Sequence, residues 1–164
     1  MFEGVRKGDV ALAAVLTILG VVLMVENITA VDPDVRIDSH SWLMVPVFAA
    51  ATLPILWRRR GILAVTLVTA VAMGVHLLAF GWVVRCGAGL PLAFALAYGV
   101  GRLAPRWQSW VGLLVILAIQ VLVLVQDSAA GLHVIPFTAV IGVAAWGVGV
   151  WLRQRVGVAV AAPV

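Results

Sequence analysis

Charged residues are scarce in this chain. They make up 11% of its 164 residues, and hydrophobic residues make up 64%. Soluble domains are about one quarter charged and close to half apolar, so this composition excludes an ordinary soluble domain and predicts an integral membrane protein. Eleven basic residues against seven acidic ones give a net charge of +4. That small excess gives no reason to expect a nucleic-acid partner.

Cysteine occurs once, as Cys86. A single cysteine excludes a disulfide within the chain and a zinc site built from several cysteines. The apolar runs carry no carboxylate deep inside them, whereas ion-coupled transporters normally use one within the membrane. No serine has a nearby histidine and acid suited to a nucleophile, and no glycine-rich phosphate loop occurs. We therefore expect no catalytic residue and no cofactor.

Acidic and histidine side chains gather in the segments between some of the apolar runs. They lack the glycine and the terminal glutamate of a calcium-binding EF-hand loop. We therefore expect a solvated rim and no metal site. The residues of this rim are Glu26, Asp32, Asp34, Asp38, His40, Asp127 and His133.

Long apolar runs divide the chain into six expected spans. The run from Trp42 to Trp82 is about twice the roughly 20 residues that a membrane-spanning helix needs. Arg58, Arg59 and Arg60 interrupt it, and because one arginine at the bilayer centre costs about 2.5 to 3.5 kcal/mol, three must lie at a water interface. The sequence thus predicts an all-α membrane protein, a single domain over residues 1–164. Its expected helices are residues 9–31, 42–57, 61–82, 88–101, 109–125 and 134–152, followed by a short apolar tail at 156–164.

Basic residues gather on one side of these spans. Only Arg36 and Arg85 fall on the opposite side. Since cytoplasmic links carry the excess of Lys and Arg, we expect both termini to be cytoplasmic and the protein to be a multi-pass protein of the cell membrane. The nine basic residues that set this topology are Arg6, Lys7, Arg58, Arg59, Arg60, Arg102, Arg106, Arg153 and Arg155.

Two polar side chains fall inside expected spans, His76 in the third and Gln120 in the fifth. Polar groups in the apolar layer usually face neighbouring helices and find partners there. One interpretation is a hydrogen bond between His76 and Gln120 that fixes helix packing. The other is a ligand site or a proton relay.

Small residues recur four positions apart in several expected spans. This spacing allows helices to approach closely, either within one chain or between two copies in a homodimer. The pairs are Ala70 with Gly74, Ala95 with Gly99, Ala97 with Gly101, and Ala145 with Gly149.

The pattern of spans and basic links also carries a family resemblance. The short second span ends in Leu53-Pro54-Ile55-Leu56-Trp57-Arg58-Arg59-Arg60, and the third begins with Ile62. Tyr98 precedes the basic link from Arg102 to Arg106, and the last span ends in Ala145-Trp146-Gly147-Val148-Gly149-Val150-Trp151-Leu152-Arg153-Gln154-Arg155. From Val10 to Arg155 the chain resembles the N-terminal membrane region of actinobacterial sensor histidine kinases of two-component systems. That family usually has proline after the triple arginine, where this chain has Gly61.

The resemblance implies a membrane domain that perceives a signal, or that anchors and dimerises. In such kinases the last span continues into a helix with the phosphorylated histidine and an ATP-binding domain. Residues 156–164 have neither, so we expect the chain as it stands to be non-catalytic. Its implied partners are the lipid bilayer, a second copy, a separate kinase or response regulator, or a larger membrane complex. A small transporter or permease subunit and an accessory structural subunit remain as alternatives.

The three consecutive arginines provide a test of the topology. We predict that changing Arg58, Arg59 and Arg60 together to Gln loosens the membrane orientation, because three of the nine basic residues on that side are lost. Reporter fusions at the links between spans measure the orientation. An unchanged orientation would show that the other six basic residues suffice.

Overall fold

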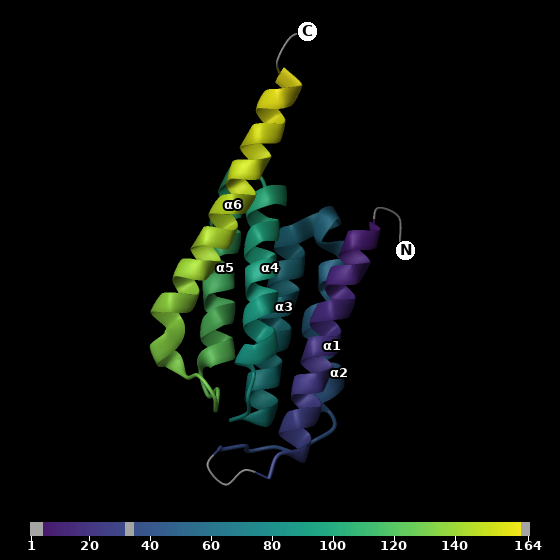
Figure 1. The fold of residues 1–164 in the computed structure, drawn as a ribbon, viewed down its shortest axis with the longest axis vertical. Helices are drawn as coiled ribbons and strands as arrows, with labels where there is room; N and C mark the ends of the chain where they lie inside the picture. The colour runs from purple at the N-terminus through teal and green to yellow at the C-terminus, as the bar shows by residue number, and fades with distance from the viewer. Residues whose placement is uncertain (1–4, 32–34, 162–164) are drawn as a thin grey trace.

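The computed structural model describes residues 5–31 and 35–161, with side chains as far as Val156. Within these residues the chain is helical, and its only strand-like pairing is an isolated bridge between Val83 and Asp127. The elements in chain order are α1 (Lys7–Thr29), α2 (Met44–Thr52), η1 (Leu53–Trp57), α3 (Arg58–Phe80), α4 (Cys86–Leu103), α5 (Arg106–Leu124), η2 (Leu132–Val134) and α6 (Ile135–Ala161). The prediction of an all-α chain is confirmed (Figure 1).

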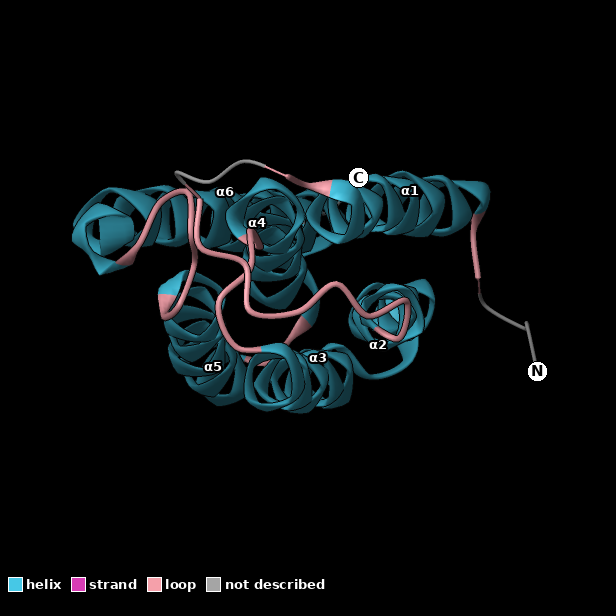
Figure 2. Ribbon diagram, turned by 90° about the horizontal axis from the view of Figure 1, so that it is seen from below, coloured by secondary structure: helices cyan, strands magenta, loops and turns pink. Residues whose placement is uncertain are grey.

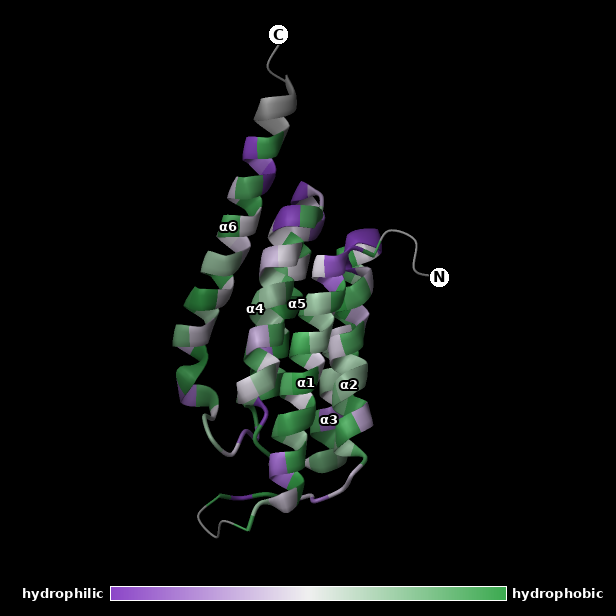
Figure 3. Cartoon of the chain, turned by 45° about the vertical axis from the view of Figure 1, so that its right-hand side comes forward, coloured by the Kyte–Doolittle hydropathy of each residue, from purple (hydrophilic) through white to green (hydrophobic). Residues whose placement is uncertain are grey.

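Among the described residues, five helical stretches are long and apolar enough to cross a membrane. They are Lys7–Thr29, Met44–Phe80, Cys86–Leu103, Arg106–Leu124 and Leu132–Val156. Many large apolar side chains on these helices are exposed. In Figure 3 the flanks of the helices are mostly green, for hydrophobic residues, and the purple, hydrophilic residues gather toward the ends of the bundle. Soluble proteins rarely expose such continuous apolar surface. The flanks therefore fit contact with lipid.

The 37-residue stretch Met44–Phe80 folds back on itself at the triple arginine. Trp57 (φ −98°, ψ 13°) and Gly61 (φ −169°, ψ 77°) both leave helical geometry. Pro54 lies in the first turn of η1, where its missing N–H costs no helical hydrogen bond. Segments α2 and η1 consequently pack against α3 in a hairpin, with the arginines at its turn.

The helices form two layers. Seen along the bundle, α6, α4 and α1 lie in one layer and α5, α3 and α2 in the other (Figure 2). Helix α4 is central, because it packs against α6, α5, α1 and α3. Its fully buried Leu92, Leu96 and Val100 form the core together with Ile116 and Ile119 of α5.

The two ends of the bundle differ in character. One end, here called the basic end, carries the start of α1, the α2–α3 hairpin turn, the α4–α5 link and the last turns of α6. The other, here called the loop end, carries residues 30–31, 35–43, 81–85 and 125–131. The nine basic residues expected on one side are all in segments of the basic end.

Helices α4 and α6 cross with their backbones in close contact. A Cβ atom on Gly101 would lie 2.2 Å from the carbonyl oxygen of Trp146, and one on Gly149 would lie 2.4 Å from that of Tyr98. Two of the predicted small-residue pairs, Ala97 with Gly101 and Ala145 with Gly149, therefore include a glycine that serves packing within the chain. Gly74 differs, since a Cβ there would meet no atom within 4 Å.

The last helix is longer than expected. Helix α6 begins at Ile135, as predicted within one residue, but it continues to Ala161 instead of ending at residue 152. Arg153, Gln154 and Arg155 are good helix formers, so the charges end the apolar stretch without ending the helix. Part of the expected tail at 156–164 is thus helical, and residues 162–164 lie outside the described part. With α2 and η1 taken together, the remaining boundaries differ from the predicted ones by at most three residues.

A pair of glycines on α6 tests the close crossing. We predict that Gly149→Ala lowers the free energy of unfolding by about 1 to 3 kcal/mol, because the new methyl group meets backbone atoms that cannot move aside. The matched control is Gly147→Ala, two residues away, where nothing lies within 4 Å. Unfolding in mixed detergent micelles gives both values. Equal stability of the two variants would contradict the packing described.

Candidate functional site

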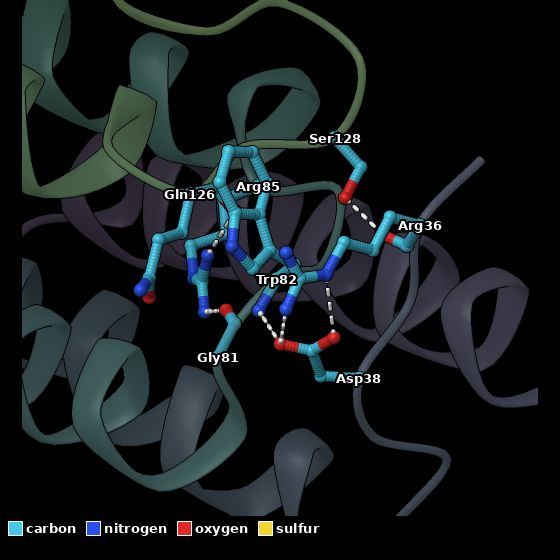
Figure 4. Close-up of polar contacts among 7 residues, drawn as sticks. All are labelled: Arg36, Asp38, Gly81, Trp82, Arg85, Gln126 and Ser128. Carbon is cyan, nitrogen blue, oxygen red and sulfur yellow. Dashed lines mark hydrogen bonds and ion pairs between the residues drawn. The ribbon is translucent and has the colours of Figure 1, made fainter.

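Arg85 is a buried cation at the loop end. It lies between α3 and α4, and its side chain is 0% exposed. Its Nε donates to Nδ1 of His76 at 3.2 Å. One Nη donates to the carbonyl of Gln126 at 3.0 Å, and the other donates to the carbonyl of Gly81 (Figure 4). Burial lowers the pKa of Arg85 to about 10, and the nearby charge of Asp127 opposes that shift. The guanidinium therefore stays charged at neutral pH.

Asp127 caps the N-terminus of α4. Its carboxylate accepts the backbone N–H groups of Arg85 at 2.6 Å and Cys86 at 2.7 Å. It also accepts those of Ala129 at 3.0 Å and Ala130 at 2.9 Å. The first N–H groups of a helix have no intrahelical acceptor, and the helix dipole favours a negative charge there. Asp127 thus satisfies four donors and joins the start of α4 to the loop that leads into α6.

The expectation of a solvated rim is wrong for Asp127. Asp127 is only 3% exposed, whereas the residues of the rim were expected to face water. The reason is the N-terminus of α4, which lies more than 40 residues away in sequence and supplies the hydrogen bonds that compensate burial of the carboxylate. Asp32 and Asp34, also assigned to the rim, lie outside the described residues.

Asn27 connects α1 to the same region. Its Oδ1 accepts the backbone N–H of Val84 at 2.8 Å, and its Nδ2 donates to the carbonyls of Val84 and Leu23, both at 2.9 Å. Asn27 is 2% exposed. A single amide side chain therefore satisfies both the donor and the acceptor of one loop residue, which holds α1 against the segment 81–85.

A more exposed set of contacts ties the loop 35–43 to the other two loops (Figure 4). The guanidinium of Arg36 pairs with Asp38 at 2.9 Å and lies 5.2 Å from the ring centre of Trp82. Asp38 in turn accepts the backbone N–H of Trp82 at 3.1 Å. The hydroxyl of Ser128 donates to the carbonyl of Arg36. The contacts of Asn27, Arg36, Asp38, Trp82, Arg85, Asp127 and Ser128 are called the loop-end network below.

His76 and Gln120 do not meet as predicted. Both are buried, at 0% and 1% exposure, and each lies four residues before the loop end of its helix, at Phe80 or Leu124. Nδ1 of His76 accepts from Arg85, so it carries no proton. Nε2 of His76 and both amide atoms of Gln120 have no hydrogen-bond partner among the described residues.

The predicted His76–Gln120 hydrogen bond is therefore wrong. Arg85 takes the place of Gln120, because the 81–85 segment folds back over the end of α3 and brings a stronger donor to the imidazole. The ring also packs edge-on against Phe48 and Phe80, with centres 5.5 and 4.8 Å away. Gln120 instead lies against α6, where a Cβ on Gly142 would be 2.4 Å from its Nε2.

Two arginines of the triple arginine form ion pairs with Asp9, a contact that the sequence analysis did not predict. Asp9 of α1 is 0% exposed, and its two oxygens accept from Nε of Arg58 at 2.7 Å and Nε of Arg59 at 2.8 Å. Its Oδ2 also accepts the backbone N–H of Arg6 at 3.1 Å. The hairpin turn is thereby fixed to the start of α1. The only signal for this contact in the sequence is that Asp9 lies on the same predicted side of the membrane as Arg58 and Arg59.

The other predicted topology residues lie nearby at the basic end. Arg153 of α6 donates to the carbonyl of Ala104, which follows the last residue of α4. The guanidinium of Arg155 lies 4.0 Å from the ring centre of Trp151. Within the described residues, no three His, Cys, Asp or Glu side chains lie close enough together to hold a metal ion.

Comparisons with protein-family models, with curated proteins and with solved structures gave no match to this chain. Its function is therefore argued from its own residues.

Asp127 provides a test of the loop end. We predict that Asp127→Ala lowers the free energy of unfolding by about 3 kcal/mol, because backbone donors at the start of α4 lose a charged acceptor while they stay buried. Glu26→Gln is the control, since it also removes one negative charge at this end and Glu26 makes none of the network contacts. It should shift stability by no more than about 0.5 kcal/mol. Similar losses for both variants, measured by unfolding in detergent, would show that Asp127 is not a cap.

Proposed function

We propose that this chain is a sensing or anchoring domain of the cell membrane, non-catalytic as it stands, with six spans and both termini in the cytoplasm. The gathering of nine basic residues at one end supports this orientation. Segments α2 and η1 would form the sixth span. Their 9 and 5 residues rise roughly 24 Å, short of a hydrocarbon core about 30 Å thick, and long arginine side chains make up such a difference by reaching to the interface.

The observation that carries the proposal is the path of α6. The loop that leads into it is held by Asp127 and Ser128 of the loop-end network. From there α6 runs along α4 and extends past the basic ends of the other helices (Figure 1). One continuous helix thus joins the network on the outer side to the cytoplasmic side, where a separate kinase, a response regulator or a second copy would contact it.

The resemblance to the membrane region of sensor histidine kinases agrees with such an output helix. The resemblance is the ground for proposing a signalling role, because in that family the last span continues into the helix with the phosphorylated histidine and the ATP-binding domain. A transporter would need a path for water to the polar groups in the helices. His76 and Gln120 are instead buried, at 0% and 1% exposure, and line none of the cavities described for the chain.

Coupling between the two ends of α6 tests the sensing role. With Cys86 replaced by Ala, we introduce Val156→Cys near the end of α6 and measure its rate of reaction with a maleimide in inside-out vesicles. Ser128→Ala, which frees the loop before α6 from Arg36, is predicted to change that rate about threefold or more, the size expected for coupling between distant sites.

The matched control is Ser41→Ala, whose hydroxyl accepts only the local N–H of Leu43 at 3.2 Å. It should leave the rate unchanged. Equal rates in all three proteins, each shown to be folded, would contradict a sensing role. Cysteine labelling along α3 and α5 addresses the transporter alternative, since reactivity that continues from the loop end to the middle of the helices would favour a water-filled path instead.

A further inference from the structure

A cavity lies between α5 and α6 at the basic end. Its volume is about 520 Å³, which is enough for a phosphate group with a small substituent. Its lining combines two arginines, two tryptophans and two smaller polar groups with an apolar edge. The residues of this cavity, called the basic cleft below, are Pro105, Arg106, Ser109, Trp110, Trp146, Val150, Arg153 and Gln154.

The positive charge of the basic cleft has no counter-ion within the described chain. Asp9 is the one acidic residue described at the basic end, and it is already paired with Arg58 and Arg59. One N–H group of Arg153 donates to the carbonyl of Ala104. The side chain of Arg106 makes no hydrogen bond or ion pair with another described residue. Two guanidinium groups beside one cavity without a carboxylate favour an anionic ligand.

The start of α5 adds to this preference. Helix α5 begins at Arg106, and Pro105 in the capping position has no side-chain group that accepts a hydrogen bond. The first N–H groups of a helix and its dipole favour an anion at this place. Since Pro105, Arg106 and Ser109 all line the cleft, the helix end and the arginines act on the same space.

Aromatic side chains form the wall toward the middle of the bundle. The rings of Trp110 and Trp146 are 4.6 Å apart, and Nε1 of Trp146 donates to the hydroxyl of Ser109 at 2.8 Å. Tryptophan prefers the level of lipid headgroups, where its ring is apolar on one side and hydrated on the other. Beyond this wall, toward the loop end, the same two helices expose Leu114 and Val143, at 67% and 43%, so an acyl chain below the cleft would meet apolar surface.

We propose that the basic cleft binds the phosphate headgroup of an anionic phospholipid in the membrane leaflet at the basic end. Arg106 and Arg153 hold the phosphate, the start of α5 adds its N–H groups, and the acyl chains run along the exposed flanks of α5 and α6. Basic pockets between helices on the cytoplasmic side are known to take such headgroups. This goes beyond the proposed sensing role, because lipid binding here needs neither the loop-end network nor a signal.

Lipid retention tests the proposal. The full chain, purified in a neutral detergent, is titrated with short-chain phosphatidylglycerol, phosphatidylcholine or inorganic phosphate, and bound molecules are counted by native mass spectrometry. The wild type should bind one phosphatidylglycerol in preference to phosphatidylcholine. Arg106→Gln with Arg153→Gln should weaken that binding about tenfold or more, since each arginine near a headgroup makes a substantial contribution.

A matched control removes the same charge elsewhere at the same end. Lys7→Gln with Arg155→Gln changes the net charge equally, and neither residue lines the cleft. This control should bind phosphatidylglycerol as the wild type does. Equal binding by all three proteins would overturn the proposal, because general attraction to the basic end would then explain it. Binding of inorganic phosphate as tight as that of the lipid would overturn the lipid as the ligand.

A single substitution separates binding from folding. Arg153 also contacts the end of α4, so its loss can disturb the packing of α6. Arg106→Gln leaves that contact in place and should still weaken phosphatidylglycerol binding severalfold without changing the unfolding midpoint. If Arg106→Gln binds the lipid like the wild type and only the double variant loses it together with its stability, the proposal is wrong.

Discussion

The carboxylate of Asp127 at the N-terminus of α4 is the contact on which the loop end of the bundle depends. It satisfies donors on both segments that it joins, the start of the central helix and the loop before α6. Close by, the guanidinium of Arg85 is buried with no carboxylate of a described residue within 4 Å, and it donates to carbonyl and imidazole acceptors instead. Backbone N–H groups thus compensate the burial of Asp127, and backbone carbonyls compensate the burial of Arg85. These contacts fix the loops around both residues, because losing one would leave a buried charge without a partner.

The basic end follows the same rule with different partners. Asp9 receives two arginines of the hairpin turn and so joins α1 to α3. Both oxygens of Asp9 are occupied by these contacts, so no carboxylate of a described residue pairs with the arginines of α5 and α6. The two ends therefore differ in more than the number of arginines. The loop end is closed by internal hydrogen bonds, while the basic end keeps positive charge available for a headgroup or a partner.

Much of the fold could be predicted from the sequence, because apolar run lengths and arginine placement depend on the bilayer alone. The hairpin at Arg58 to Arg60 and the start of α6 illustrate this. The site could not be predicted in the same way. Arg85 and Asp127 look like ordinary loop charges. Only the return of the chain over α3 brings Arg85 to His76, and only the loop after α5 brings Asp127 to the start of α4. Likewise, no local pattern connects Asp9 with arginines 49 and 50 residues away.

The crossing of α4 and α6 determines what kind of motion the proposed output helix can make. Backbone contact at Gly101 and Gly149 leaves no side chain between the helices to compress, so sliding or separation at this point is opposed. Toward the loop end α6 also packs against α5, where the Gln120 amide lies close to Gly142. About 14 residues of α6, or roughly 21 Å, lie before this crossing, and about 12 residues, or roughly 18 Å, lie after it. A displacement at the loop end would therefore reach the basic end as a tilt about the crossing, in the opposite direction and with nearly the same amplitude.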